Sequence, residues 1–151
     1  MRRITKSAIV AYSPQQMYDL VNDIEAYPQF LPWCSDSRIV SRDDSIVVAE
    51  VEMNKGGMRR RFATRNQLTP PDRINVALVD GPFRELNGDW RFVALREAGC
   101  EVRLNMQFEF AGMLVDMALG PFFEQTCRSL IDAFVGRARQ IYPAAATPSR
   151  E

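Results

Sequence analysis

The hydrophobic pattern of this chain changes its period once, at Gly112, and that change limits the folds open to it. From about residue 36 to residue 110, apolar and polar residues alternate, as in β-strands with one buried face. The clearest strand is "CEVRLNMQFEF" (100–110), in which every even-numbered residue is apolar. After Gly112 the apolar residues recur with a period of 3.6 as far as Pro143, which predicts one long helix with a kink or a short preceding turn at Pro121.

Turn signals divide the alternating region into antiparallel strands. Glycine, proline and aspartate gather in "DDS", "NKGG", "TPPD", "DGPF" and "REAG", where they supply the backbone angles that turns need. A meander of about six such strands must curl, and its apolar face needs a cover. The long helix is the only predicted element large enough to provide that cover.

The N-terminal segment adds a strand and a short helix. Residues 2–12 alternate like a strand, and Ser13 and Pro14 suit the N-cap and the first position of a helix over 14–24. We therefore predict an α+β fold in which a curved antiparallel sheet of six to seven strands surrounds a long C-terminal helix. The predicted domain covers residues 1–143, and residues 144–151 are predicted to be a flexible tail.

The segment "AYPQFLPWCSD" (26–36) is unusual because connecting segments are usually polar. It carries large apolar residues, and its two prolines, Pro28 and Pro32, leave room for at most one helical turn. We predict that Phe30, Leu31 and Trp33 form a stiff lip over the mouth of a cavity between the sheet and the helix. The alternative is a hydrophobic plug that completes the core without a ligand.

Two segments carry a resemblance to a known family. The segments "VNDIEAYPQFLPWCSDSRIV" (21–40) and "LVDGPFRELNGDWRF" (78–92) resemble the coenzyme Q-binding branch of the START-like superfamily, which also contains a bacterial ribosome-association toxin. The resemblance covers residues 3–142 and implies the helix-grip fold. It also implies an apolar tunnel for a polyprenyl quinone, with ubiquinone the first choice and the protein a chaperone that supports respiration. The targeting presequence of mitochondrial members is missing, so the chain resembles a bacterial member.

The predicted ligand site combines the lip, the second motif and apolar residues of the sheet and the long helix. An empty tunnel of about 300 Å³, the lower end for ligand pockets, would cost about 7 kcal/mol, so we expect it to be filled or collapsed. Methionines would give it an adaptable lining, although they are also ordinary core residues. The predicted ligand-binding residues are Tyr27, Phe30, Leu31, Trp33, Arg60, Phe62, Phe83, Trp90, Phe92, Met106, Phe108, Met117, Phe122 and Phe123.

The segment "MRRRF" (58–62) forms a basic cluster with two possible meanings. On a strand, Arg59, Arg61 and Arg65 share one face, where they could contact the phosphates of ribosomal RNA or anionic lipid. Alternatively, this face is simply solvated, and its arginines pair with Glu50 and Glu52 of the neighbouring strand. Arg60 lies on the apolar face, from which it could reach a quinone carbonyl inside the cavity.

The amino-acid composition further limits the classes of function that this chain can have. The chain has no histidine, which excludes histidine-dependent triads and metal sites, and its three cysteines lack the spacing of a zinc site. Nineteen basic and 19 acidic residues balance, so net charge does not point to DNA. We predict a non-catalytic, cofactor-free quinone-binding protein in the bacterial cytoplasm, with a peripheral inner-membrane contact as an option. A toxin that binds the large ribosomal subunit and blocks subunit joining is the alternative, and a cyclase or hydratase enzyme is third.

Overall fold

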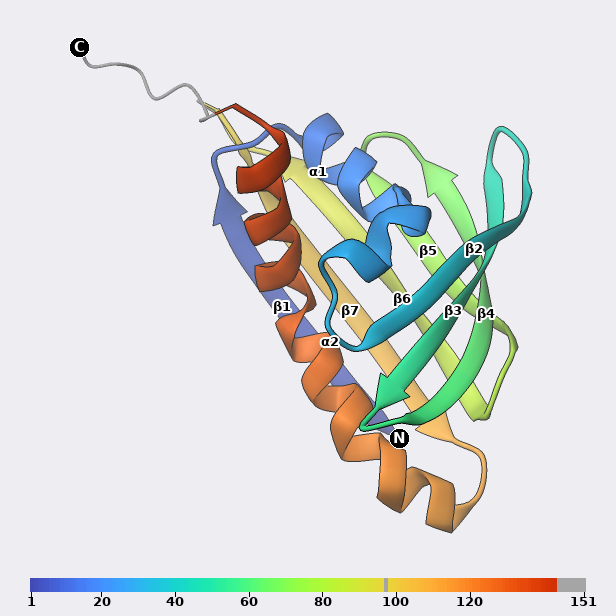
Figure 1. Cartoon of the computed structure of the whole chain (residues 1–151). Helices are drawn as coiled ribbons and strands as arrows, with labels where there is room; N and C mark the ends of the chain where they lie inside the picture. Colours follow the sequence, from blue (N-terminus) through green and yellow to red (C-terminus); the bar gives the residue numbers. More distant parts are fainter. Residues whose placement is uncertain (97, 144–151) are drawn as a thin grey trace.

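The fold is a strongly curved sheet wrapped against one long helix, as a computed structural model of residues 1–96 and 98–143 describes it (Figure 1). All seven strands are antiparallel neighbours in the order β1-β7-β6-β5-β4-β3-β2. The predicted α+β helix-grip fold is confirmed, and the predicted tail at 144–151 lies outside the described residues. The elements are β1 (Arg2–Val10), α1 (Pro14–Asn22), the 3-10 helix η1 (Ile24–Gln29), β2 (Cys34–Arg42), β3 (Ile46–Lys55), β4 (Met58–Thr69), β5 (Arg73–Asp80), β6 (Phe83–Ala94), β7 (Cys100–Phe110) and α2 (Met113–Ile141).

Helix α1 begins at the predicted signal. The Ser13 hydroxyl accepts a hydrogen bond from the Gln16 backbone N–H, and the Gln16 side chain accepts one from the Ser13 N–H, which together form a capping box. The helix ends at Asn22, two residues earlier than predicted, and η1 follows it. This 3-10 helix has six residues and contains Pro28, so it lies mostly before the stretch between the two prolines, where we expected at most one turn.

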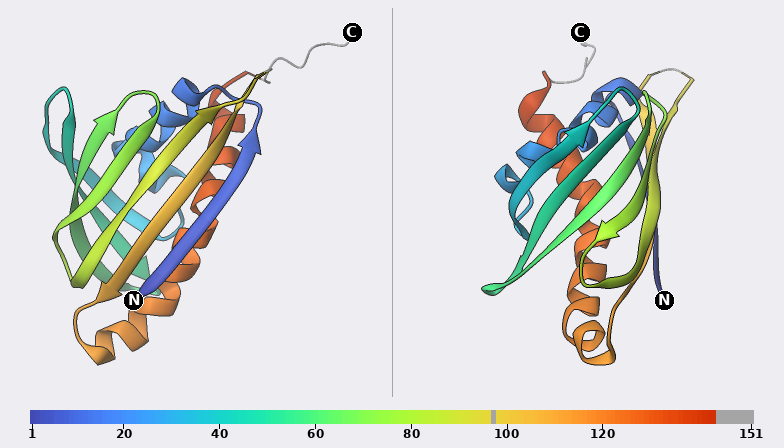
Figure 2. Two further views of the ribbon diagram at one scale, coloured as in Figure 1. Left: turned by 180° about the vertical axis from the view of Figure 1, so that it is seen from behind. Right: turned by 90° about the vertical axis from the view of Figure 1, so that its right-hand side faces the viewer.

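The concave face of the sheet carries the core, and α2 lies against it (Figures 1 and 2). Along β7 the predicted alternation is confirmed: every even-numbered residue from Cys100 to Phe110 is buried. Helix α2 continues through Pro121, so of the two expectations, a kink or a short preceding turn, the separate turn is wrong. None of the helices within the described residues combines the length and apolar composition needed to cross a bilayer.

Strand β6 is longer than the sequence indicated. The turn predicted at "DGPF" (80–83) includes Phe83, whereas β6 begins at Phe83 and pairs with β7 from there. The backbone N–H of Ala111 donates to the Pro82 carbonyl at 2.7 Å, so pairing continues to the end of the turn. Phe83 is therefore a buried residue of strand β6 and does not belong to the preceding loop.

Five phenylalanine rings fill the half of the interior near the start of α2, and we call them the aromatic cluster. They come from three strands and the helix, so they join elements that are distant in sequence. Phe83 stacks on Phe110 with ring centroids 4.3 Å apart, and Phe108 meets Phe123 edge-on at 4.7 Å, both favourable geometries. The members are Phe62, Phe83, Phe108, Phe110 and Phe123, and each is buried.

Candidate functional site: an interior cavity and a charged outer face

A cavity of about 90 Å³ lies beside the aromatic cluster, between the inner face of the sheet, α2 and the segment from α1 to Trp33. Its walls are mostly apolar, as binding sites for small hydrophobic molecules usually are. The volume is smaller than the tunnel of about 300 Å³ assumed from the sequence. Six of the predicted ligand-binding residues line the cavity: Tyr27, Trp33, Phe62, Trp90, Met106 and Phe123.

Six other predicted residues pack around the cavity and do not line it. Phe83 and Phe108 belong to the aromatic cluster, where the two rings meet edge-on at 6.3 Å. Phe92 and Leu31 are buried core residues. The remaining two are half-buried: Phe30 packs edge-on against Tyr27 and Phe134, and Phe122 lies under the Lys55 ammonium.

Two predicted residues, Arg60 and Met117, are exposed, and the prediction that they face the cavity is wrong. Arg60 does project from the inner face of β4, opposite the buried Met53, but its own side chain is exposed. Its guanidinium donates to the Arg59 carbonyl at 2.9 Å. Met117 is two residues from the buried Leu119, about 200° around the helix, so it points away from the sheet.

The segment that we predicted to be a lip is held rigidly in place. The Tyr27 hydroxyl donates a hydrogen bond to the Val21 carbonyl, and the Tyr27 ring meets Phe134 of α2 edge-on at 5.6 Å. Burial raises the pKa of this hydroxyl, so it remains neutral. The Trp33 carbonyl accepts a hydrogen bond from the Asn54 N–H of β3 at 2.8 Å. These contacts fix Trp33 at the edge of the cavity.

Polar groups that we did not predict also line the cavity. The Thr64 hydroxyl donates to the Asn66 side-chain oxygen at 2.9 Å within the buried wall, and Thr126 of α2 contributes a further polar group. The indole N–H of Trp33 is buried, and no acceptor among the described residues bonds to it. The period-two pattern of the sequence could have identified these polar residues, because Thr64 and Asn66 share the inner face of β4 with Phe62. The cavity is thus apolar with a few fixed donors and acceptors.

The three cysteines are buried, and burial controls their chemistry. Burial raises the thiol pKa of Cys34 and Cys100 to about 11 and that of Cys127 to about 12. We expect iodoacetamide at about pH 8 to label the folded protein at least 100-fold more slowly than the urea-unfolded chain, because the thiolate is the nucleophile. Mass spectrometry would count the labels. Rapid labelling of one cysteine in the folded protein would contradict this expectation.

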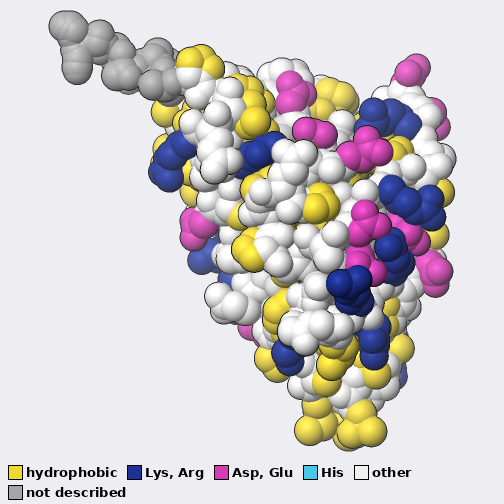
Figure 3. All heavy atoms as spheres, viewed as in Figure 1, with side chains coloured by type: hydrophobic (Ala, Val, Ile, Leu, Met, Phe, Trp, Pro, Cys, Tyr) yellow, Lys and Arg dark blue, Asp and Glu magenta, His cyan; other side chains and the backbone are white. Residues whose placement is uncertain are grey.

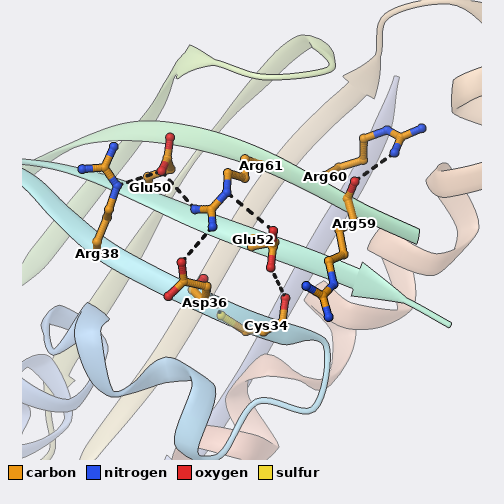
Figure 4. Close-up of polar contacts among 9 residues, drawn as sticks. Cys34, Asp36, Arg38, Glu50, Glu52, Arg59, Arg60 and Arg61 are labelled. Carbon is orange, nitrogen blue, oxygen red and sulfur yellow. Dashed lines mark hydrogen bonds and ion pairs between the residues drawn. The ribbon is translucent and has the colours of Figure 1, made fainter. Parts of the chain in front are cut away.

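Arg61 is the centre of an ion-pair network on the outer face of β2, β3 and β4 (Figure 4). Its guanidinium lies 2.8 Å from Asp36, 3.1 Å from Glu50 and 3.5 Å from Glu52. Arg38 adds a contact of 2.9 Å to Glu50. The alternative interpretation, a solvated face with arginines paired to acids, is therefore confirmed for Arg61.

Arg59 and Arg65 share this outer face, and both are exposed. Within residues 1–96 and 98–143, neither forms an ion pair with a carboxylate. Their charges, unlike that of Arg61, are available to an external anion.

Replacing Arg61 with glutamine is expected to raise the pKa values of Asp36 and Glu50. The hydrogen bond from Arg61 is the main cause of the lowered pKa of Asp36, and Arg38 and Arg61 together lower that of Glu50. A lowered carboxyl pKa gives stability at neutral pH that is lost as pH falls through the folded-state value, so the variant should lose less stability on acidification. Carbon-detected NMR titration would measure both groups, with Arg65→Gln as the control. Unchanged pKa values in Arg61→Gln would contradict the network.

The fold and the cavity together define the class of this protein. A curved antiparallel sheet around a long C-terminal helix, with an apolar cavity between them, is the helix-grip architecture of START-like proteins. The sequence matches the family described as "Polyketide cyclase / dehydrase and lipid transport" over residues 10–135, and the chain belongs to this family.

Individual relatives differ in the functions that their names state. The ribosome association toxin RatA of Pseudomonas aeruginosa is 45% identical over 139 residues, which cover 92% of this chain and 96% of the relative. The mitochondrial coenzyme Q-binding protein COQ10 homolog B of Xenopus laevis is 28% identical over 142 residues, covering 91% of this chain and 58% of the relative. The crystal structure of the Zhui aromatase/cyclase superimposes with a TM-score of 0.82 at 18% identity, covering 95% and 97% of the two chains, and shows the shared fold alone.

Proposed function

We propose that this chain associates with the ribosome, binding the large subunit and blocking subunit joining, and that it catalyses no reaction. The observation that carries the proposal is the end-to-end identity of 45% with a protein named for ribosome association. The relative named for coenzyme Q binding is more distant, and its match covers little more than half of its length. The absence of histidine in the sequence also disfavours acid–base catalysis.

The small volume of the cavity favours ribosome association over quinone binding as the function of this chain. At about 24 cal/mol per Å³, a cavity of about 90 Å³ costs roughly 2 kcal/mol when it is empty. A domain of ordinary stability tolerates that cost, whereas the 7 kcal/mol expected for a quinone-sized tunnel would have demanded an occupant. The protein can therefore remain folded without a ligand, as a ribosome-binding protein requires.

The direct test is sedimentation of purified protein with purified ribosomal subunits. We expect the protein to sediment with the large subunit and not with the small one, and to reduce the peak of joined ribosomes. Because phosphate contacts release counterions, the logarithm of the binding constant should fall linearly with the logarithm of salt concentration. Failure to sediment with the large subunit at low salt would overturn the proposal.

Two exposed arginines provide a sharper form of the same test. We expect Arg59→Gln/Arg65→Gln to weaken binding and to reduce the salt slope by about 0.9 for each lost phosphate contact. Arg61→Gln is the matched control on the same face: Arg61 is already bound by three carboxylates, so its loss should leave the slope unchanged. An unchanged slope in Arg59→Gln/Arg65→Gln would show that these two arginines do not contact the ribosome.

A second candidate function is binding of a small apolar molecule that carries a hydrogen-bond acceptor, ubiquinone being the predicted example. The unpartnered indole N–H of Trp33 beside an apolar cavity supports it, because a buried donor without an acceptor is costly. Mass spectrometry of an organic extract of protein made in its own host should then find such a molecule. The extract of Val76→Phe, which places a ring in the cavity wall, should lack it. An extract of the unaltered protein without any lipid or quinone would rule this function out.

A further inference from the structure

The first turns of α2 expose three large apolar side chains next to one another. The exposed fractions are 79% for Met113, 80% for Leu114 and 67% for Met117. Figure 3 shows hydrophobic side chains gathered at the lower end of the molecule, where Figure 1 places the start of α2. We call these three residues the apolar tip. Scattered exposed apolar residues are ordinary, but a contiguous group marks an interaction surface.

The fold explains why this group has no partner within the described chain. The views in Figures 1 and 2 agree that α2 begins beyond the end of the sheet. On its inner side the helix is half-buried at Val115 and fully buried from Leu119 onwards, where Leu119 and Phe123 lie in the core. Gly112, with φ of +92°, turns the chain out of β7 into this projecting helix.

Unopposed basic groups lie beside the apolar tip. The Lys55 ammonium donates to the Ala118 carbonyl at 3.0 Å, which places it next to Met117 on the helix. Arg60 is exposed at the same end of the β3–β4 hairpin. Within the part of the chain that the structure describes, neither cation pairs with a carboxylate.

Three acids close to the apolar tip are already paired with cations among the described residues. Asp116 of the first turn of α2 forms an ion pair with Arg2 at 3.1 Å, and Glu124 lies 3.5 Å from the same guanidinium. Glu109, at the end of β7, lies 3.9 Å from the N-terminal amine. Asp80, at the end of β5, is exposed at this end of the molecule and forms no ion pair among the described residues, so the two basic residues beside the tip leave an excess of one positive charge.

We propose that the apolar tip docks onto an anionic lipid bilayer, inserting Met113, Leu114 and Met117 among the acyl chains while Lys55 and Arg60 contact the headgroups. The apolar side chains and the cations are both needed to identify the binding partner as an anionic bilayer. Apolar side chains gain free energy in lipid but gain none from the phosphates of RNA, and the cations distinguish an anionic bilayer from a neutral one. The proposal is independent of ribosome association.

The test uses the full chain and vesicles of two compositions. We expect the protein to sediment with vesicles that contain phosphatidylglycerol and phosphatidylcholine, and to remain in solution with phosphatidylcholine alone. A Met113→Cys variant labelled with an environment-sensitive dye should show a blue-shifted emission only with the anionic vesicles. The native thiols are buried, so the dye would react selectively at the new site.

Paired variants separate the apolar contribution from the charged one. Leu114→Ser/Met117→Ser should lower vesicle affinity about 100-fold, and its control is Ile9→Ser, an equally exposed apolar residue at the far end of β1, which should change nothing. Lys55→Gln/Arg60→Gln should lower affinity about fivefold for each charge. Its control, Arg42→Gln/Arg139→Gln, removes the same net charge elsewhere on the surface.

Each remaining outcome would overturn the proposal. Equal binding to neutral vesicles would exclude the headgroup contacts, and equal losses in Ile9→Ser and Leu114→Ser/Met117→Ser would exclude insertion at the apolar tip. If Leu114→Ser/Met117→Ser abolished sedimentation with ribosomes while vesicle binding was absent, the tip would be a ribosome contact instead. Circular dichroism of each variant would show that it remains folded, as expected for substitutions at exposed positions.

Discussion

Replacing Phe123 with alanine is expected to lower the free energy of unfolding by about 3–5 kcal/mol. Phe123 is the ring of α2 that contacts all four other members of the aromatic cluster, with centroids between 4.7 and 5.9 Å away. Alanine would leave a hole among rings that come from three strands, and such a hole cannot close without moving the sheet. Urea denaturation followed by tryptophan fluorescence would measure the loss.

The neighbouring residue is a matched control of the same type. Phe122 is half-buried and contacts the Lys55 ammonium, 5.9 Å from its ring centroid, at the surface of the molecule. Phe122→Ala should therefore cost only about 1 kcal/mol. Similar losses in the two variants would show that the aromatic cluster does not have the central role described here.

Gly88→Ala is the second substitution with a large expected effect. A Cβ atom at Gly88 of β6 would lie 2.2 Å from the Asn105 carbonyl oxygen and 2.9 Å from the Met106 Cα, both backbone atoms of β7. Backbone atoms inside a sheet cannot move aside as a flexible side chain can, so the pairing of β6 with β7 must distort. We expect a loss of about 3 kcal/mol, measured by urea denaturation.

The same substitution, glycine to alanine, is expected to have the opposite effect on stability at Gly136. It lies within α2, and a Cβ atom there would meet nothing within 4 Å. Gly136→Ala should raise stability by about 1 kcal/mol, because alanine is the better helix former. A stabilising Gly88→Ala would contradict the close strand approach, and a destabilising Gly136→Ala would contradict the open surroundings of that helix face.

The sequence predicted the architecture well because the architecture depends on local periodicity. The alternation of 100–110 and the change of period at Gly112 identified β7 and α2, and Ser13 identified the start of α1. The boundary of β6 was missed because "DGPF" contains the residues of a turn. Pairing of Phe83 with β7 overrides that local signal, and such pairing is a tertiary effect.

The candidate site was predicted less completely, for a physical reason. The alternation of apolar and polar residues tells which face of a strand a residue occupies. It does not tell whether that residue's side chain is covered by the core. Arg60 was assigned to the correct face of β4, opposite the buried Met53, yet its side chain is exposed and its guanidinium donates to the Arg59 carbonyl. The cavity is the space that remains between packed rings. Its volume was overestimated because no local sequence pattern measures how closely those rings pack.

The order of strands in the sheet has a consequence for how this chain reaches its folded state. Among the described strands β1 pairs with β7 alone, and Arg2 lies opposite Phe108, so β1 is synthesised before the other six strands but must wait to pair until β7, the last of them, has been made. Its hydrogen-bonding edge stays open throughout that wait, as a template for intermolecular pairing. Because such distant contacts must close before the sheet is complete, we expect refolding in about milliseconds to seconds rather than microseconds.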